Sequence, residues 1–234
     1  MALALLIVTI ALIGWLAWGS WEISSGVYLR TQCRLNDSDI HDAPEHTIEH
    51  TIEHSVALTF DDGVDPVITP QILDILALHN AKATFFLIGD RAAQHPTLVR
   101  RIATEGHTIG NHSMHHRPTF PLQSTRQITA EIAECNALLA SIIGTKPTLF
   151  RPPFGVTNPM ISKAVRRSKI RAIGWSIRSY DTMRHPSAQT LERITRRLRP
   201  GDIILLHDNL PQAPALLEQL LLHISAKGYA CRPL

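Results

Sequence analysis

Short apolar runs and helix-like stretches follow one another along the chain from Ser55 onward. Runs that suit buried strands occupy residues 56–60, 83–88, 108–110, 148–150, 172–175, 202–206 and 228–231. Between them, apolar residues recur at helical spacing, which predicts helices over 69–79, 124–143, 159–168, 187–198 and 214–226, and another through Leu98, Val99 and Ile102. Strands that alternate with helices indicate a parallel sheet. We therefore expect an α/β fold whose sheet is closed, or nearly closed, into a barrel.

The first 21 residues differ from this pattern, because the run over residues 2–18 is apolar and carries no charge. A membrane-spanning helix needs about 20 mostly apolar residues and at least about 17. Trp15, Trp18 and Trp21 gather at the far end of the run, as aromatic residues do at a membrane interface. We predict a transmembrane anchor over residues 1–21. A cleaved secretory signal is the alternative, but no positively charged region precedes the run.

Residues 22–54 are polar and irregular, and we expect them to form a stem. They include a tandem Glu-His-Thr-Ile repeat over 45–54, which favours a flexible linker over a specific metal site. The three cysteines allow at most one intrachain disulfide. Cys33 and Cys231 flank the regular part of the chain, and they either pair in an oxidising compartment or remain free thiols.

The chain has 234 residues, enough for one domain with a sizeable core, which we place at residues 55–234. The formal net charge is only +3, and two basic clusters, at 166–171 and 193–199, fall on predicted helices. Solvent-exposed helix faces account for such clusters, and no nucleic-acid-binding motif accompanies them. We therefore expect no nucleic-acid partner. The oligomeric state has no signal in the sequence.

Five polar motifs stand at the ends of the predicted strands. They occupy residues 59–63, 112–116, 151–155, 175–181 and 205–208. The carboxyl ends of the strands in a barrel of this kind meet at one face, and that face carries the chemistry. We therefore expect these motifs to form one site that holds carboxylates, imidazoles and a guanidinium.

His112 and His116 are the candidate metal ligands within these motifs. Two histidines four residues apart are a weak signal alone, because the chain has 13 histidines. Together with the paired carboxylates of Asp61 and Asp62, however, they offer two imidazoles and one carboxylate. This set suits a catalytic divalent cation with open positions for water and substrate. Zinc (Zn) is our first expectation, and cobalt (Co), nickel (Ni) or manganese (Mn) also fit.

Taken together, the five motifs resemble those of the polysaccharide deacetylases of the NodB-homology type, carbohydrate esterase family four. The resemblance covers residues from Ser55 to the C-terminus. It implies a distorted (β/α) barrel of the NodB-homology type. It also implies a hydrolase that removes N-acetyl groups from the amino sugars of a glycan, such as peptidoglycan, a chitin-like oligomer or a surface polysaccharide.

The resemblance also implies roles for individual residues. The metal ligands would be Asp62, His112 and His116. The catalytic groups would be Asp61 as general base, His207 as general acid, Arg151 beside the base and Asp181 beside the acid. The substrate-binding residues would be Pro153, Phe154, Trp175 and Leu205, with the Phe154 N–H facing the oxyanion and Leu205 contacting the acetyl methyl group.

Three positions depart from the pattern of the family. Val64 stands where proline is usual, Arg178 where many members carry an acid, and Thr182 where tryptophan is usual. None of these changes removes a group that the reaction requires. Arg178 and Thr182 do change a groove wall, so they bear on which glycan fits.

Two other functions remain as alternatives. A membrane anchor would suit a deacylase of a lipid-linked sugar. A catalytically silent glycan-binding barrel is disfavoured, because the base, the acid and all three metal ligands are present. A glycan substrate favours an extracytoplasmic catalytic domain on a single-pass membrane protein, whereas Arg30 and Arg34, close after the apolar run, favour the cytoplasmic side.

Overall fold

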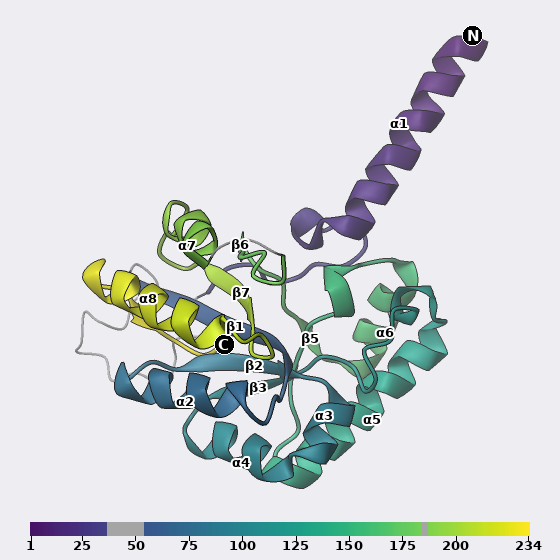
Figure 1. Cartoon of the computed structure of the whole chain (residues 1–234). Coiled ribbons are helices and arrows are strands. Elements are labelled where there is room, and N and C mark those ends of the chain that lie inside the picture. The colour runs from purple at the N-terminus through teal and green to yellow at the C-terminus, as the bar shows by residue number, and fades with distance from the viewer. Residues whose placement is uncertain (37–53, 184–186) are drawn as a thin grey trace.

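Parallel strands form a curled sheet at the centre of the computed structural model, which describes residues 1–36, 54–183 and 187–234 (Figure 1). The longest strand, β1 (Ser55–Gly63), lies between β2 (Ala83–Leu87) and β7 (Ile203–His207). The strand order is β5-β4-β3-β2-β1-β7-β6, and β8 pairs with the start of β1. The other bounds are Thr108–Asn111 for β3, Leu149–Phe150 for β4, Arg171–Ala172 for β5, Ile177–Arg178 for β6 and Ala230–Cys231 for β8.

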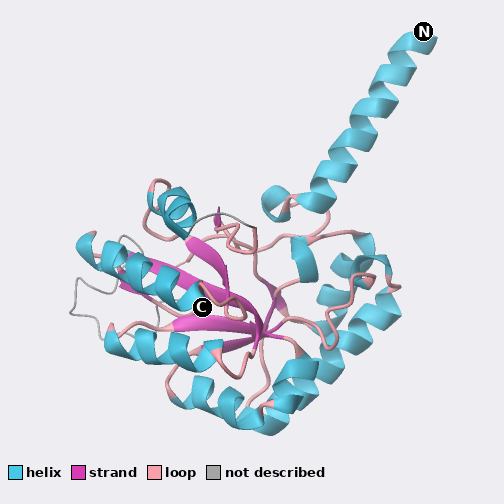
Figure 2. Cartoon of the chain, in the orientation of Figure 1, coloured by secondary structure: helices cyan, strands magenta, loops and turns pink. Residues whose placement is uncertain are grey.

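Helices lie around the outside of the sheet (Figure 2) and bury apolar side chains against it. They are α2 (Ile68–Leu78), α3 (Gly89–Gln94), α4 (Pro96–Thr104), α5 (Thr125–Ile143), α6 (Pro159–Ser168), α7 (Ser187–Thr195) and α8 (Ala213–Ala226), with one-turn 3₁₀ helices at Phe120–Leu122 and Pro153–Gly155. Helix α5 begins at a capping box formed by Ser124 and Gln127 and ends at Gly144, as helix start and stop signals predict. The predicted alternation of strands and helices is confirmed.

The central strands are apolar on both faces because both faces are covered. All of β2 and residues 55–61 of β1 are buried. Phe60 of β1 stacks on Phe85 of β2, with 5.1 Å between the ring centroids. A parallel strand in this position lacks the in–out alternation of a half-exposed strand, which is why these strands appear as continuous apolar runs in the sequence.

The sheet is a curled half-barrel, and its end strands β5 and β6 are not paired with each other in the described ranges. The predicted strand over 172–175 ends early, at Ala172. Two residues later, a side chain at Gly174 would collide with Cys33, since a Cβ there would lie 2.6 Å from the Cys33 sulfur. The barrel is open between β5 and β6, where a closed or nearly closed one was expected.

The start of the predicted stem lies across this opening. Gln32 forms a parallel bridge with Ile173, just after β5, and Arg34 forms an antiparallel bridge with Asp202, just before β7. The Arg34 guanidinium also pairs with the Asp202 carboxylate at 2.8 Å. The chain before β1 thus links the two sides of the half-barrel.

Apolar side chains of the same segment are buried in the domain. Ile23, in a 3₁₀ turn at Ile23–Ser25, is 1% exposed, and Leu29 and Leu35 are 7% and 6% exposed. Residues 23–35 are therefore packed on the barrel, in contrast to the stem expected over 22–54. The repeat over 45–54 lies, apart from His54, outside the described residues.

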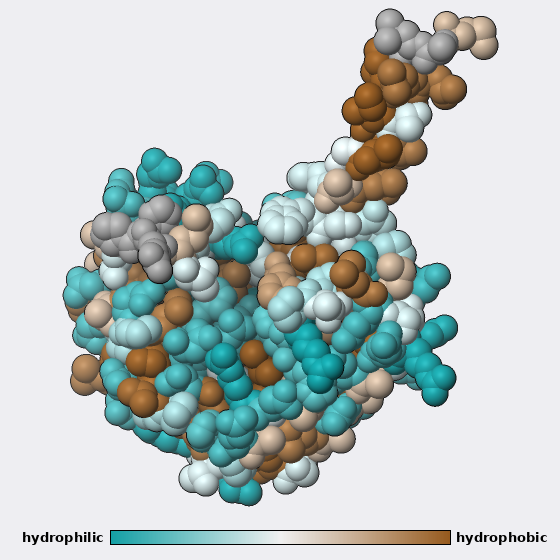
Figure 3. All heavy atoms as spheres, turned by 45° about the vertical axis from the view of Figure 1, so that its right-hand side comes forward, coloured by the Kyte–Doolittle hydropathy of each residue, from teal (hydrophilic) through white to brown (hydrophobic). Residues whose placement is uncertain are grey.

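Helix α1 (Ala2–Trp21) projects from this body (Figures 1 and 3). From Leu5 to Trp15 its large apolar side chains are exposed, among them Leu6, Ile10 and Ile13. Within the described ranges, no helix combines the length and the apolar character needed to cross a membrane. The predicted transmembrane helix over residues 1–21 is therefore not confirmed.

The three cysteines all lie in the described ranges and are free. Cys33 lies beside Gly174, whereas Cys231 belongs to β8, beside the amino end of β1. The disulfide considered between Cys33 and Cys231 is not formed.

The packing of residues 23–35 predicts that Leu35→Ala destabilises the domain by about 2–4 kcal/mol, as for other buried leucines. Leu122→Ala is the matched control, because Leu122 is 84% exposed, and it should change the free energy of unfolding by less than about 0.5 kcal/mol. Urea denaturation of the full chain measures both. Equal, small effects of the two substitutions would show that the segment is a linker after all.

Candidate active site

The carboxyl ends of the parallel strands bring the five motifs to one edge of the sheet. Asp61 in β1 is directly opposite His207, the last residue of β7. His112 follows the last residue of β3, and Arg151 follows the last residue of β4. Asp181 comes three residues after the end of β6. The convergence expected from the spacing of the motifs is therefore present.

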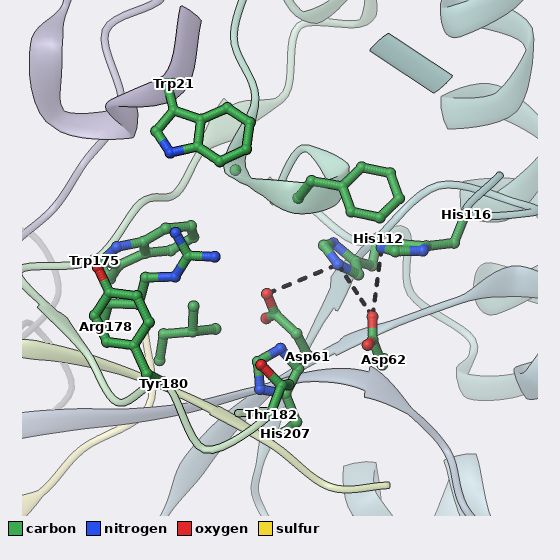
Figure 4. A pocket seen from close by; sticks show the side chains of 13 residues that line it. Trp21, Asp61, Asp62, His112, His116, Trp175, Arg178, Tyr180, Thr182 and His207 are labelled. Carbon is green, nitrogen blue, oxygen red and sulfur yellow. Dashed lines mark ion pairs between the residues drawn. The ribbon is translucent and has the colours of Figure 1, made fainter. Parts of the chain in front are cut away.

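Asp62, His112 and His116 each bring one ligand atom to a common point (Figure 4). Nε2 of His112 and Nε2 of His116 lie 3.5 and 3.4 Å from Oδ1 of Asp62. The three ligand atoms all lie within 4.8 Å of one another. Ligands about 2.0–2.2 Å from one tetrahedral ion are roughly 3.3–3.6 Å apart, so the two distances from Asp62 to the imidazoles match those of a divalent cation site.

The protonation of the two imidazoles also fits a metal site. Nδ1 of His112 lies 2.8 Å from the carbonyl oxygen of Arg151. Because a carbonyl only accepts, Nδ1 carries the proton and Nε2 presents its lone pair to the site. Burial lowers the pKa of His116 to about 4, and the neighbouring His112 acts in the same direction. His116 is therefore neutral at neutral pH, as a ligand must be.

Left-handed backbone conformations aim these ligands. The φ angles are 70° at Asp62, 69° at Ser113 and 48° at His116, and such conformations cost roughly 1–3 kcal/mol each in residues other than glycine. Local hydrogen bonds hold the histidine loop: the Ser113 N–H donates to Oδ1 of Asn111 at 2.8 Å, and the His116 N–H donates to Oγ of Ser113 at 3.0 Å. The intervening His115 faces elsewhere and bonds Asp90.

Arg151 is fully buried and orients Asp61 through a hydrogen bond. Its Nη1 donates to Oδ1 of Asp61 at 2.7 Å and to Oγ1 of Thr59 at 2.8 Å, and Nη2 donates to the carbonyl oxygen of Gly174 at 2.8 Å. One carboxylate oxygen of Asp61 is thus occupied. The other, Oδ2, lies 3.7 Å from Nε2 of His112 and so faces the metal ligands, where it can accept a proton.

Asp181 lies behind His207 and sets its charge. Oδ1 of Asp181 lies 2.8 Å from Nδ1 of His207, and Oδ2 accepts from the His207 backbone N–H at 2.9 Å. Burial opposes protonation of His207, but the hydrogen bond and charge of Asp181, with the charges of Asp61 and Asp62, raise its pKa to about 9. His207 is therefore an imidazolium at neutral pH and can donate a proton.

A cavity of about 280 Å³ opens in front of these groups (Figure 4). Of the predicted substrate-binding residues, Phe154, Trp175 and Leu205 line it. Pro153 is buried and does not line it. Gly155, next to Phe154, has φ of 69° and packs so closely under Trp175 that a Cβ would lie 2.3 Å from the indole ring. This contact fixes the wall that Trp175 forms.

Five further residues line the cavity without having been predicted as binding residues: Trp21, Gly155, Arg178, Tyr180 and Thr182. Arg178 lies 5.6 Å from the centroid of the Trp175 ring and 5.0 Å from that of Tyr180, and Thr182 is nearby. Arg178 and Thr182 had been noted as departures from the family pattern. Trp21, the last residue of α1, also lines the cavity. Its position after an apolar run gave no local signal of this role.

Comparison with known proteins places this chain in a family. The polysaccharide deacetylase family matches residues 35–173. The chain is 34% identical over 174 residues to the peptidoglycan-N-acetylglucosamine deacetylase PgdA of Listeria monocytogenes, an alignment that covers 74% of this chain and 36% of the relative. The chain thus spans about a third of the length of that relative.

Two further proteins are similar over most of both lengths. A chitooligosaccharide deacetylase of Rhizobium leguminosarum bv. trifolii is 37% identical over 156 residues, covering 67% of this chain and 72% of the relative. The structure of the peptidoglycan deacetylase PdaC of Bacillus subtilis superposes with a TM-score of 0.72 at 30% identity, covering 76% of this chain and 87% of that one. This protein belongs to the polysaccharide deacetylase family, and the resemblance drawn from its five motifs is confirmed.

The pairing of Asp181 with His207 predicts that Asp181→Asn lowers the pKa of His207 from about 9 toward or below its ordinary value of 6.5. The sign follows because the substitution removes the charge that stabilises the imidazolium, while burial, which destabilises it, stays. NMR titration of the histidine ring signals in the metal-free protein measures both values.

The control for this titration is Asp74→Asn, which removes a carboxylate from the exposed surface, where Asp74 pairs with Arg101. It should leave the His207 titration in place. A His207 pKa that stays near 9 in Asp181→Asn would show that another group holds the proton.

Proposed function

We propose that this protein is a metal-dependent hydrolase that removes N-acetyl groups from amino sugars of a glycan. The observation that carries the proposal is the joint presence of a three-ligand metal site, a carboxylate with one free oxygen beside it and a charged histidine across the same cavity. Each group has one task in amide hydrolysis, and the family to which the chain belongs supports the assignment.

Asp62, His112 and His116 would hold the divalent cation, with zinc as the first candidate and cobalt, nickel or manganese as alternatives. When bound, the cation supplies Lewis acidity, which lowers the pKa of a water molecule and polarises a carbonyl oxygen. The chain supplies a neutral His116 and a fixed tautomer of His112 for this purpose.

Asp61 acts as the general base. Its Oδ1 is held by Arg151 at 2.7 Å, so only Oδ2 is available for the proton of the attacking water. That oxygen lies 3.7 Å from the Nε2 atom of His112, so it would be within reach of a water molecule on an ion held by the three ligands. Arg151 fixes the carboxylate in this direction through a buried, charge-assisted hydrogen bond.

His207 acts as the general acid. An amine is a poor leaving group unless it is protonated as the carbon–nitrogen bond breaks. With a pKa of about 9, His207 carries the required proton at neutral pH. Its Nδ1 is engaged by Asp181, so Nε2 is the atom that donates.

The walls of the cavity would position the acetylated sugar. Leu205, which is 3% exposed, offers an apolar contact for the acetyl methyl group. The N–H of Phe154 would face the developing oxyanion, where a preorganised donor contributes about 3–4 kcal/mol. Trp175 would form the wall on the other side. Peptidoglycan and chitin-like oligomers are the substrates that we propose first, since relatives named for both are similar to this chain.

The catalytic role of the metal site predicts that a chelator abolishes acetate release from N-acetylglucosamine oligomers by the full chain, and that zinc or cobalt restores it. Asp61→Asn should keep the metal, because Asp61 is not a ligand, yet lower kcat by at least about 100-fold. Asp62→Asn should lose metal affinity instead. Acetate assays and metal analysis of the same samples separate the two effects.

Asp74→Asn serves as the control in these assays, since Asp74 lies on the surface and should keep full activity and metal content. Undiminished activity in Asp61→Asn would exclude Asp61 as the base. Metal binding without acetate release from any free glycan would favour a lipid-linked sugar as the acceptor, and a failure to bind metal would favour a silent glycan-binding barrel.

Helix α1 favours a second candidate, the deacylation of a lipid-linked sugar. Its apolar side chains are exposed, while its last residue lines the cavity. Should α1 associate with a membrane, the cavity would open close to the lipid surface, where the sugar of a lipid-linked substrate lies. We propose this association, with the catalytic domain on the extracytoplasmic side where surface glycans occur.

This second candidate predicts that the full chain in vesicles releases acetate from N-acetylglucosamine linked through diphosphate to a polyprenol faster than from a chitin oligomer at equal concentration. The same chain in detergent micelles, without vesicles, supplies the comparison. Equal rates on both acceptors in vesicles would leave the free glycan as the substrate.

A further inference from the structure

Trp21 is an aromatic residue at the mouth of the cavity. It has no part in the reaction proposed above. It is 73% exposed, more than the other tryptophans of α1, Trp15 at 51% and Trp18 at 52%. Among these three, Trp21 is the residue that lines the cavity (Figure 4). A large indole that is left open beside a catalytic centre lacks a packing role, so its exposed face is available to a ligand.

The position of Trp21 is set by contacts between the end of α1 and the domain. The buried Thr157 donates from its backbone N–H to the carbonyl oxygen of Ser20 and from its hydroxyl to the carbonyl oxygen of Gly19, both at 2.9 Å. These bonds join the helix end to the chain just after Phe154 and Gly155, which themselves line the cavity.

Close packing at Gly19 strengthens this attachment. A Cβ at Gly19 would lie 2.7 Å from the Cβ of Val27, so only glycine lets the two segments approach this closely. One turn earlier, the hydroxyl of Tyr28 donates to the carbonyl oxygen of Leu16 at 3.3 Å. The end of α1 is therefore attached to the domain at several points, and Trp21 belongs to the rim of the cavity.

The other walls of the cavity also carry aromatic side chains, which could contact the same ligand as Trp21. Tyr180, 40% exposed, and Phe154, 46% exposed, offer further aromatic surface. In the close-up, Trp21 lies above Trp175, Arg178 and Tyr180, and Asp61 and the metal ligands lie to the right of these four residues (Figure 4). A pyranose ring presents apolar C–H faces that pack on aromatic rings and a polar edge that suits Arg178.

We propose that Trp21 is a glycan-binding residue that packs on the sugar next to the one that loses its acetyl group. The end of α1 is then part of the binding site, so the helix contributes to the choice of glycan as well as projecting from the domain. This inference rests on the proposed function, because it takes a glycan as the substrate. It adds a residue from outside the five motifs to the binding site.

The test compares Trp21→Ala, Trp21→Phe and Trp18→Ala in the full chain, held in detergent micelles with zinc. Acetate release is measured on tetra-N-acetylchitotetraose. Trp21→Ala is expected to raise KM about tenfold, because an apolar contact with one sugar face is lost, and to change kcat much less. Trp21→Phe should recover most of the loss. Trp18→Ala, the same change one turn earlier on the same helix, should leave KM within about twofold.

A binding measurement separates failure of this inference from failure of the proposed function. Calorimetry with the same tetrasaccharide is done on Asp61→Asn and on Asp61→Asn with Trp21→Ala. Suppose that the wild type releases acetate. If Trp21→Ala then has the KM of the wild type, or if Trp18→Ala raises KM as much as Trp21→Ala does, only the role of Trp21 is overturned. Binding that Trp21→Ala weakens, without acetate release by the wild type, supports Trp21 and overturns the proposed reaction. If the protein neither binds the tetrasaccharide nor releases acetate from it, both the role of Trp21 and the proposed reaction are overturned.

Discussion

The buried guanidinium of Arg151 is the interaction on which the site depends. A charge without access to water must be paired, and removing one partner of such a pair costs about 3–5 kcal/mol. Arg151 therefore keeps Asp61, Thr59 and the carbonyl of Gly174 in place around it, which ties β4 to β1 and to the chain after β5. Its own carbonyl oxygen also fixes the ring of His112. The orientations of the proposed base and of a proposed metal ligand thus depend on two groups of the same residue.

The adjacent carboxylates of Asp61 and Asp62 point in different directions, which suits them to different roles. Asp61 still belongs to the regular part of β1, paired with β7, and points back toward Arg151. Asp62 has left that geometry, with φ of 70°, and points toward the two imidazoles. Successive strand residues point to opposite sides, and the turn at Asp62 adds to this divergence. One carboxylate can therefore accept a proton while its neighbour serves as a ligand.

Most of this site could be predicted from the sequence because its members stand at the carboxyl ends of strands or soon after them. Parallel strands place their carboxyl ends together, so the positions of Asp61, His112 and His207 in the sequence sufficed to bring them into one site. The sequence could not predict features that depend on long-range packing. The barrel is open because its end strands β5 and β6 do not pair in the described ranges, and the burial of residues 23–35 depends on edges that exist only in the folded sheet. The apolar pattern of α1 carries no information on where Trp21 ends up.

The groups proposed for the reaction and those proposed for the choice of glycan therefore lie in different parts of the structure. The groups proposed for the chemistry stand at strand ends, where a sheet covered on both faces and the buried Arg151 hold them rigidly. The residues proposed to contact the rest of the glycan stand on loops and on the end of α1, where exposed side chains can change without disturbing the core. Substitution at such positions alters the fit of a sugar at little cost in stability. A cavity built in this way can keep one reaction while its outer wall, including Trp21, selects the glycan that enters.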